Sequence, residues 1–443
     1  LLGVFTLWAL LKIRVSYLSL LPRFMILVYS MPFSILLGHL LSHDYIWAWT
    51  PKSIALVADV VLMRQLTTVG LVGSMGFVSG MYWIMLWRSS LNRLQRTLPQ
   101  GKAAHTRTLD LPWYYILLTI SLFFSYLSAP KDTIFQISYG GEELLNTLAT
   151  ALNFNASYVV SYIILVVLFL DVQREWNVTR KKRKRFSLGA TTLYIIIFLQ
   201  LLRGDRESSG LIVALAALYL TSPIRQVAFI FWKQIIINRL NRLVIPTGIV
   251  VTIFILLASA RVTLSDAGSA FNILDALQAG WSTSPWTMTL FTNLGVASLY
   301  RDGTLDYRYG QTYFDYMLSL PPGVLTQLFG YERRLEAWNN PGVDVWNTGI
   351  TSGGLHIALV PFMNFGILGV FFFLALYGAV IAYLELISQR ETFWPKLLWA
   401  STFVIGFIWF WYTDMSMIRG MMAALLVGFL YKAILPYRLS SVR

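Results

Sequence analysis

The sequence contains no cysteine and only four histidines. The absence of cysteine excludes disulfide bonds, a thiolate nucleophile and cysteine-ligated metals. The histidines stand at positions 39, 43, 105 and 356 and do not form a metal-ligand motif. We therefore expect no metal site.

Charged residues are also scarce. They make up 13% of the chain and hydrophobic residues 56%, whereas about 25% of the residues in soluble domains are charged. Apolar runs recur that approach the roughly 20 residues a spanning helix needs. The alternating ten-residue segments of a membrane barrel are absent, so the spans must be helical. The sequence thus predicts an all-α, polytopic transmembrane helix bundle in one integral membrane domain, 1–443. Its eleven or so segments are expected near 1–11 (incomplete), 24–41, 66–87, 112–129, 156–170, 187–202, 210–224, 243–260, 364–384, 396–412 and 417–436.

The loops between these segments differ in charge. About two thirds of the 35 Lys and Arg residues lie in one alternate set of loops, and about three quarters of the 21 acidic residues lie in the other. Because cytoplasmic loops carry the excess of Lys and Arg, the basic set is cytoplasmic. The C-terminus is then cytoplasmic, while 203–210 and the long segment 261–351 face outward. Basic loops that set the orientation in the membrane also account for the net charge of +14. We therefore expect the lipid bilayer as a partner and do not expect the positive charge to bind nucleic acid.

One expected span carries glycines at regular spacing. In "VGLVGSMGFVSG", Gly70, Gly73, Gly76 and Gly80 follow one strip of a helix. Small residues let two membrane helices approach closely, so this strip predicts close helix packing rather than a binding site.

Arginine on the outward side is the exception to the charge pattern. In "LLRGDRESSGLIV", Arg203 and Arg206 lie on one face if the helix continues through them. Asp205 and Glu207 could simply neutralise them. The alternative is a guanidinium clamp for a diphosphate at the membrane surface, since the planar fork donates paired hydrogen bonds to phosphate. Arg419, at the outer start of the last span, is a third arginine at this level.

The long outward segment 261–351 alternates aromatic and polar residues, notably in "LYRDGTLDYRYGQTYFDYMLSLPPG". Flat rings suit the C–H faces of sugars and polar groups suit hydroxyls, although an ordinary surface loop has a similar composition. Arg301, Arg308 and Tyr309 are the candidate substrate-binding residues here.

The following stretch, "TSGGLHIALVPFMNFGILGV", is too short before Pro361 to cross a membrane. It predicts a re-entrant or outward half-helix over 352–363. His356 within it is either a structural hydrogen-bonding residue or a general base for a sugar hydroxyl. The other candidate bases are the loop carboxylates Asp302, Asp306 and Asp315.

Three of these stretches resemble motifs of the O-antigen and exopolysaccharide repeat-unit polymerases (Wzy type), which are related to the O-antigen ligases. "LLRGDRESSGLIVALAALYL" is similar to the family's "gsRg" and apolar span. "YRYGQTYFDYMLSLPP" is similar to its loop motif, and "NFGILGV" to its "nfGxxG" helix start. The resemblance covers roughly 190–435, with the motifs in the family's order.

This resemblance implies a metal-independent, inverting glycosyltransferase without a cofactor, in the bacterial inner membrane. A growing glycan would pass from undecaprenyl diphosphate to a lipid-linked repeat unit at the periplasmic face, for lipopolysaccharide or exopolysaccharide synthesis. A chain-length regulator is the candidate protein partner. By motif, Arg206 matches the family arginine. His356 lies one residue nearer the glycine motif than in the ligases, and Val360 and Pro361 stand where many polymerases carry an acidic residue. The general base is therefore not fixed by the resemblance.

Two other functions compete. An O-antigen ligase would use the same chemistry with a lipid A–core acceptor. A flippase or transporter of lipid-linked oligosaccharide would instead place charges along an internal path, and most spans here lack central charges. A membrane scaffold leaves the outward arginines unexplained.

Overall fold

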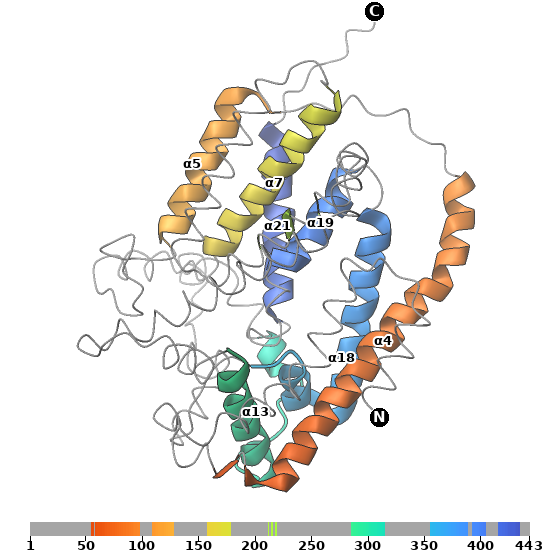
Figure 1. The fold of residues 1–443 in the computed structure, drawn as a ribbon, viewed down its shortest axis with the longest axis vertical. Coiled ribbons are helices and arrows are strands. Elements are labelled where there is room, and N and C mark those ends of the chain that lie inside the picture. Colours follow the sequence, from red (N-terminus) through yellow and green to blue (C-terminus); the bar gives the residue numbers. More distant parts are fainter. Residues whose placement is uncertain are drawn as a thin grey trace, which may run out of the picture. The chain divides into compact units, whose positions relative to one another are not determined.

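The structure is a computed structural model, and it describes residues 55–56, 58–97, 109–127, 157–178, 211, 214–215, 218, 285–314, 355–388, 392–404 and 415–434. Within these residues every regular element is an α-helix, which confirms the helical fold class (Figure 1). The elements are α4 (Val60–Thr97), α5 (Leu111–Leu127), α7 (Ser157–Val178), α13 (Pro285–Arg301), α18 (Leu359–Ser388), α19 (Phe393–Val404) and α21 (Met415–Ile434). The spans predicted near 1–11, 24–41, 187–202 and 243–260 lie outside the described residues.

Three of these helices are long and apolar enough to cross a membrane: Val60–Ile84 of α4, Leu359–Ser388, and Met417–Ile434 of α21. Two shorter apolar helices, Pro112–Phe124 and Val159–Gln173, lie within α5 and α7. Large apolar side chains such as Trp83, Phe372 and Phe429 are exposed on the long helices, as expected where a helix faces lipid. The described part is thus compatible with a multi-pass membrane protein.

The chain divides into two compact units. The first comprises Leu1–Leu86, Ile236–Tyr383 and Ile408–Ser416, and the second comprises Trp87–Ile235, Leu384–Phe407 and Met417–Arg443. In the first unit, α13 and the start of α18 bury a shared core against α4, built from Leu62, Leu66, Phe291, Leu294, Leu359 and Met363 among others. This core lies beneath the candidate functional site.

Further along, α4 and α18 approach so closely that only glycine fits. A Cβ on Gly76 would lie 2.3 Å from the carbonyl oxygen of Phe371, and one on Gly80 would lie 1.8 Å from that of Ala375. The contact is reciprocal, because a Cβ on Gly378 would lie 2.1 Å from the carbonyl oxygen of Phe77. The close packing predicted for this strip is confirmed at Gly76 and Gly80.

In the second unit, polar side chains fasten apolar helices together. α5 packs along α7 (Figure 1), and the two helices exchange hydrogen bonds at one level. Ser121 donates to the carbonyl of Ser161 at 3.0 Å, and Ser161 donates to that of Ser121 at 2.8 Å. The buried carboxylate of Asp171 in α7 accepts from the Leu109 amide, just before α5, and from the Tyr431 hydroxyl of α21.

Candidate functional site

The site begins with a break in helix α18. Gly366 has φ 65° and ψ −157°, values that no residue inside a helix adopts. The break interrupts the ladder of i to i−4 hydrogen bonds. The carbonyls just before it accept from a distant loop instead: the Arg308 amide donates to Met363 at 3.1 Å, and the Tyr309 amide donates to Asn364 at 3.0 Å.

We call residues 306–310, "DYRYG", the docked loop. Its last amide is held by a side chain, since Gly310 donates to Oδ1 of Asn364 at 2.9 Å. The side-chain nitrogen of Asn364, Nδ2, donates to the carbonyl of Val360 at 2.8 Å. Asn364 is 0% exposed. One buried asparagine therefore connects the docked loop to the first turn of α18.

Tyr300 supports the docked loop from α13. Its hydroxyl lies 3.1 Å from the carbonyl oxygen of Met363 and 3.2 Å from that of Asp306, so these two oxygens share its single proton. Its ring packs against Tyr307 and Phe362, with centroids 5.5 and 5.8 Å away. Burial raises the pKa of Tyr300 to about 12. The hydroxyl is therefore protonated at neutral pH and keeps its role as a donor.

The docked loop has a conformation that is unusual for its residues. Tyr309 has φ 46° and Gly310 has φ 92°. Positive φ costs nothing for glycine, but it makes a bulky residue a genuine outlier. The Tyr309 side chain is nevertheless 79% exposed, so it gains little from burial in the fold. A Cβ on Gly310 would lie 3.2 Å from the Phe365 ring, which shows how closely the loop follows the helix.

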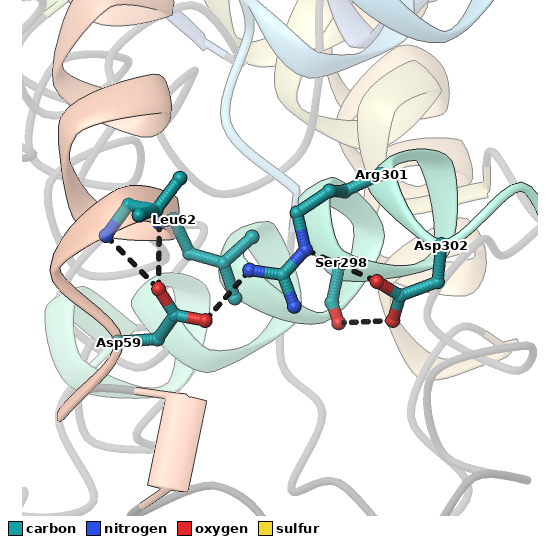
Figure 2. A network of polar contacts seen from close by, with 6 residues as sticks. Asp59, Leu62, Ser298, Arg301 and Asp302 are labelled. Carbon is teal, nitrogen blue, oxygen red and sulfur yellow. Dashed lines mark hydrogen bonds and ion pairs between the residues drawn. The ribbon is translucent and has the colours of Figure 1, made fainter.

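Arg301, predicted to bind substrate, makes an ion pair with the start of α4. Its Nη1 lies 2.6 Å from Oδ2 of Asp59, and its Nε lies 3.0 Å from Oδ1 of Asp302. Figure 2 shows the Asp59 carboxylate between Arg301 and the first turn of α4. There its Oδ1 accepts from the amides of Val61 and Leu62, the arrangement of a helix N-cap. The Arg301 guanidinium lowers the pKa of Asp59 below its usual value.

His356 lies in the turn before α18 and is 1% exposed. Its Nδ1 accepts from the Ala358 amide at 3.2 Å, and its own amide donates to Oδ1 of Asn293 at 3.2 Å. A side chain that accepts from the amide two residues ahead stabilises a turn in the manner of asparagine. Burial lowers the pKa of His356 to about 3. These surroundings favour the structural alternative for His356, and its role as a base stays a prediction.

Two of the residues predicted to bind substrate, Arg308 and Tyr309, are neighbours in the sequence and lie in the docked loop. Arg301 lies at the end of α13, where it is paired with Asp59 and Asp302. Arg419 is half-buried in α21, a helix of the second unit. Arg203, Arg206 and Asp315 lie outside the described residues, as do 352–354 of the predicted half-helix. From Leu359 onward that segment is the first turn of α18.

Sequence reasoning missed three residues that organise this site, Asp59, Asn293 and Tyr300, and it quoted Asn364 only as the start of the "NFGILGV" motif. Asn293 and Asn364 carried a signal, because an amide inside an apolar run must find partners when it is buried. Asp59 also carried one, since it stands directly before an apolar helix as an N-cap does. Nothing in the sequence marked Tyr300 among many aromatic residues.

Comparisons of this chain with protein-family models, with curated proteins and with solved structures give no match. Within the described ranges, no three His, Asp or Glu side chains are grouped so that they could hold a metal ion.

Proposed function

We propose that this chain is a polysaccharide polymerase of the inner membrane. It transfers a growing glycan from undecaprenyl diphosphate to a lipid-linked repeat unit at the periplasmic face. The long segment 261–351 is periplasmic and the C-terminus is cytoplasmic, as the positive-inside pattern indicates. The proposal assigns the chain to the Wzy-type polymerases that its motifs resemble.

The observation that supports this proposal most is the contact between two of its motifs. "YRYG" and "NFG" are more than 50 residues apart in the sequence, yet two hydrogen bonds to Asn364 join them, and a third links Arg308 to Met363, the residue before "NFG". Motifs that contact each other form one structural unit, so their joint presence in the chain has a physical reason. A functional surface at this end of α18 is the simplest account of that unit.

The role proposed for each residue follows from its charge and its exposure. Arg206, with Arg203, binds the diphosphate, because guanidinium groups match phosphate oxygens and stay charged. Diphosphate is a good leaving group, so the enzyme mainly has to orient the acceptor and stabilise charge on the departing phosphate. Arg301 is less suited to that task, since it already pairs with Asp59 and Asp302. Its part in the proposal is to hold α13 against α4.

The surroundings of each candidate also indicate which residue is suited to act as the general base. A group whose pKa is about 3 is a weak base at neutral pH, and only 1% of His356 is exposed to meet an acceptor. Asp302 is engaged by Arg301 and Ser298. Asp306 is exposed and belongs to the docked loop. Among the described candidates we therefore favour Asp306 over His356.

The deciding experiment is polymerisation by purified protein supplied with lipid-linked repeats, with products resolved by length. Arg206→Ala should abolish elongation at near-normal protein abundance. Arg206→Lys should restore it poorly, because an ammonium group lacks the planar fork. Arg64→Ala is the matched control: Arg64 is an exposed arginine near the start of α4, outside all three motifs. It should retain wild-type activity.

Other results would redirect the proposal. Full elongation by Arg206→Ala would eliminate the diphosphate clamp. Transfer of glycan only to lipid A–core would identify the ligase alternative. Movement of lipid-linked oligosaccharide across vesicle membranes without any elongation would identify the transporter.

A further inference from the structure

We propose that Tyr307 and Tyr309 form a carbohydrate platform, and that Asn364 is the residue that positions it. The ligand is a pyranose ring of the glycan, which stacks on the exposed tyrosine rings. This inference depends on the proposed function for the nature of the ligand. It goes further by naming the surface that meets the sugar and the buried residue that shapes it.

The first argument is the combination of strain and exposure at Tyr309. A bulky side chain at φ 46° is unfavourable, and such residues persist only where their surroundings impose the conformation. Glycine at this position would relieve the strain. Since 79% of the Tyr309 side chain is exposed, burial in the fold does not explain the tyrosine. We infer that its ring serves a contact outside the described fold.

The second argument is the support beneath the Tyr307 ring and the Tyr309 backbone. Tyr307 is 42% exposed, and its buried side packs on Tyr300 and on the backbone at Gly366, where a Cβ would lie 3.4 Å from the ring. The Tyr309 and Gly310 amides are fixed by the carbonyl and the side chain of Asn364. Two tyrosines separated by one residue are thus held on a rigid base at the broken end of α18.

The third argument identifies the ligand class. Sugars present C–H faces that pack on the electron-rich faces of aromatic rings, and hydroxyl groups that need hydrogen-bonding partners. Asp306 and Gln311, which stand before and after these tyrosines in the sequence, are exposed and are candidates for such partners. A purely apolar ligand would leave these polar groups without a role. The competing occupant is the membrane interface, where tyrosine is enriched.

Asn364 is a positioning residue in this account, because it is buried and cannot touch the sugar. Its Oδ1 holds Gly310 at positive φ, and its Nδ2 holds the first turn of α18. Removing the side chain should release the Gly310 amide and let Tyr309 relax to negative φ. The ring would then leave the platform.

The test uses full-length protein in nanodiscs and two readouts. Saturation-transfer NMR is measured with methyl α-glucoside, methyl α-galactoside, methyl α-mannoside and methyl N-acetyl-α-glucosaminide as probes. Amide hydrogen exchange is followed over residues 306–310. The informative pair is Tyr309→Gly, which keeps the backbone conformation but removes the ring, and Tyr309→Phe, which keeps the ring.

At least one glycoside should show transfer to the wild-type protein, near-equal transfer to Tyr309→Phe, and at least fivefold less to Tyr309→Gly. Exchange in Tyr309→Gly should stay as slow as in the wild type. Asn364→Ala should lose transfer and exchange faster at Gly310. Asn364→Asp keeps the acceptor oxygen, so its transfer should lie between those of Asn364→Ala and the wild type.

Transfer that is equal for wild type and Tyr309→Gly, or absent for all four probes, would overturn the platform. Unchanged exchange and transfer in Asn364→Ala would overturn the positioning role. If Asn364→Ala does not fold, Asn364→Asp is the test instead: it loses the Nδ2 donor to Val360, so wild-type transfer and exchange in this variant would overturn the positioning role. The probes carry no lipid and no diphosphate, so a Tyr309-dependent signal beside a failed polymerisation assay would reject only the proposed function.

Discussion

At the scale of single residues, three buried polar side chains in the first unit share one task. His356, Asn293 and Asn364 are each at most 1% exposed. Each accepts a hydrogen bond from a backbone amide, donated by Ala358, His356 and Gly310 respectively. An unpaired buried amide costs about 1–3 kcal/mol, so these side chains stabilise irregular backbone beside apolar helices. We expect their loss to affect folding as much as chemistry.

His356→Asn separates the two roles considered for this histidine. Asparagine places an oxygen near the position of Nδ1 and still accepts from the Ala358 amide, but it cannot act as a base. If His356 supports the turn, His356→Asn should keep at least half of the polymerisation rate, and His356→Ala should mainly lower the folded yield. A general base is worth about 10²- to 10⁴-fold. A loss of that size in well-folded His356→Asn would establish the catalytic role.

The same substitution predicts a change in pH dependence. The pKa of His356 is about 3 in the fold and 6.5 for the free side chain, so the unfolded chain binds a proton more readily. The fold should therefore lose stability as the pH falls from about 6.5 toward 3, by at most about 1.4 kcal/mol per pH unit. In His356→Asn this part of the slope should be absent. Thermal unfolding in detergent across this range measures it, and an identical slope in both proteins would argue against a neutral buried histidine.

Asp59 combines two roles that substitutions can distinguish. Asp59→Asn keeps an N-cap oxygen for Val61 and Leu62 but loses the charge that faces Arg301. Because exposed ion pairs contribute little, Asp59→Asn should lower the melting temperature less than Asp59→Ala. The lowered pKa of Asp59 means that its contribution is present above pH 4 and lost in stronger acid. Equal melting temperatures for the two variants would show that capping is not the main role.

At the scale of elements, the contact between α4 and α18 depends on missing side chains. Backbone carbonyls of each helix occupy the space where a Cβ of the other would lie. Such close approach lets two apolar helices gain van der Waals contact in a solvent that gives them no hydrophobic driving force. It also fixes α18 upstream of the contact, where the break at Gly366 receives the docked loop.

Gly80→Ala should therefore destabilise the first unit. The new methyl group would lie 1.8 Å from a carbonyl oxygen of the backbone, so the helices must separate, at a cost of about 1–3 kcal/mol. Gly73→Ala is the matched control, because the nearest atom to its Cβ is a side-chain methyl of Val370 at 3.3 Å. Thermal unfolding in one detergent should rank Gly80→Ala well below Gly73→Ala. Equal stability would mean that the helices do not pack this closely in the membrane.

At the scale of the whole molecule, orientation in the membrane is the hypothesis on which the site assignments depend. The chain has no cysteine, so single cysteines report position without interference. A cysteine in place of Asn340 should react with a membrane-impermeant maleimide added to intact spheroplasts. One in place of Lys182 should react only after the membrane is permeabilised. The reverse pattern would place the motifs in the cytoplasm and overturn the proposed function.

The amino-acid sequence was enough to predict an all-helical chain with apolar segments long enough to span a membrane, because apolar length and scarce charge are properties of composition and local order. It also identified the glycine strip, since helical periodicity places Gly76 and Gly80 on one face. These conclusions need no knowledge of which segments meet.

The partners of individual polar residues became visible only in the folded chain. Arg301 pairs with Asp59, and Asn364 holds Gly310. Both contacts join segments that are far apart in the chain. No local pattern encodes such contacts, because a side chain's propensity is the same whichever segment lies beside it. The same reason applies to His356: its residue type permits either a base or a turn acceptor, and burial with a backbone partner favours the second.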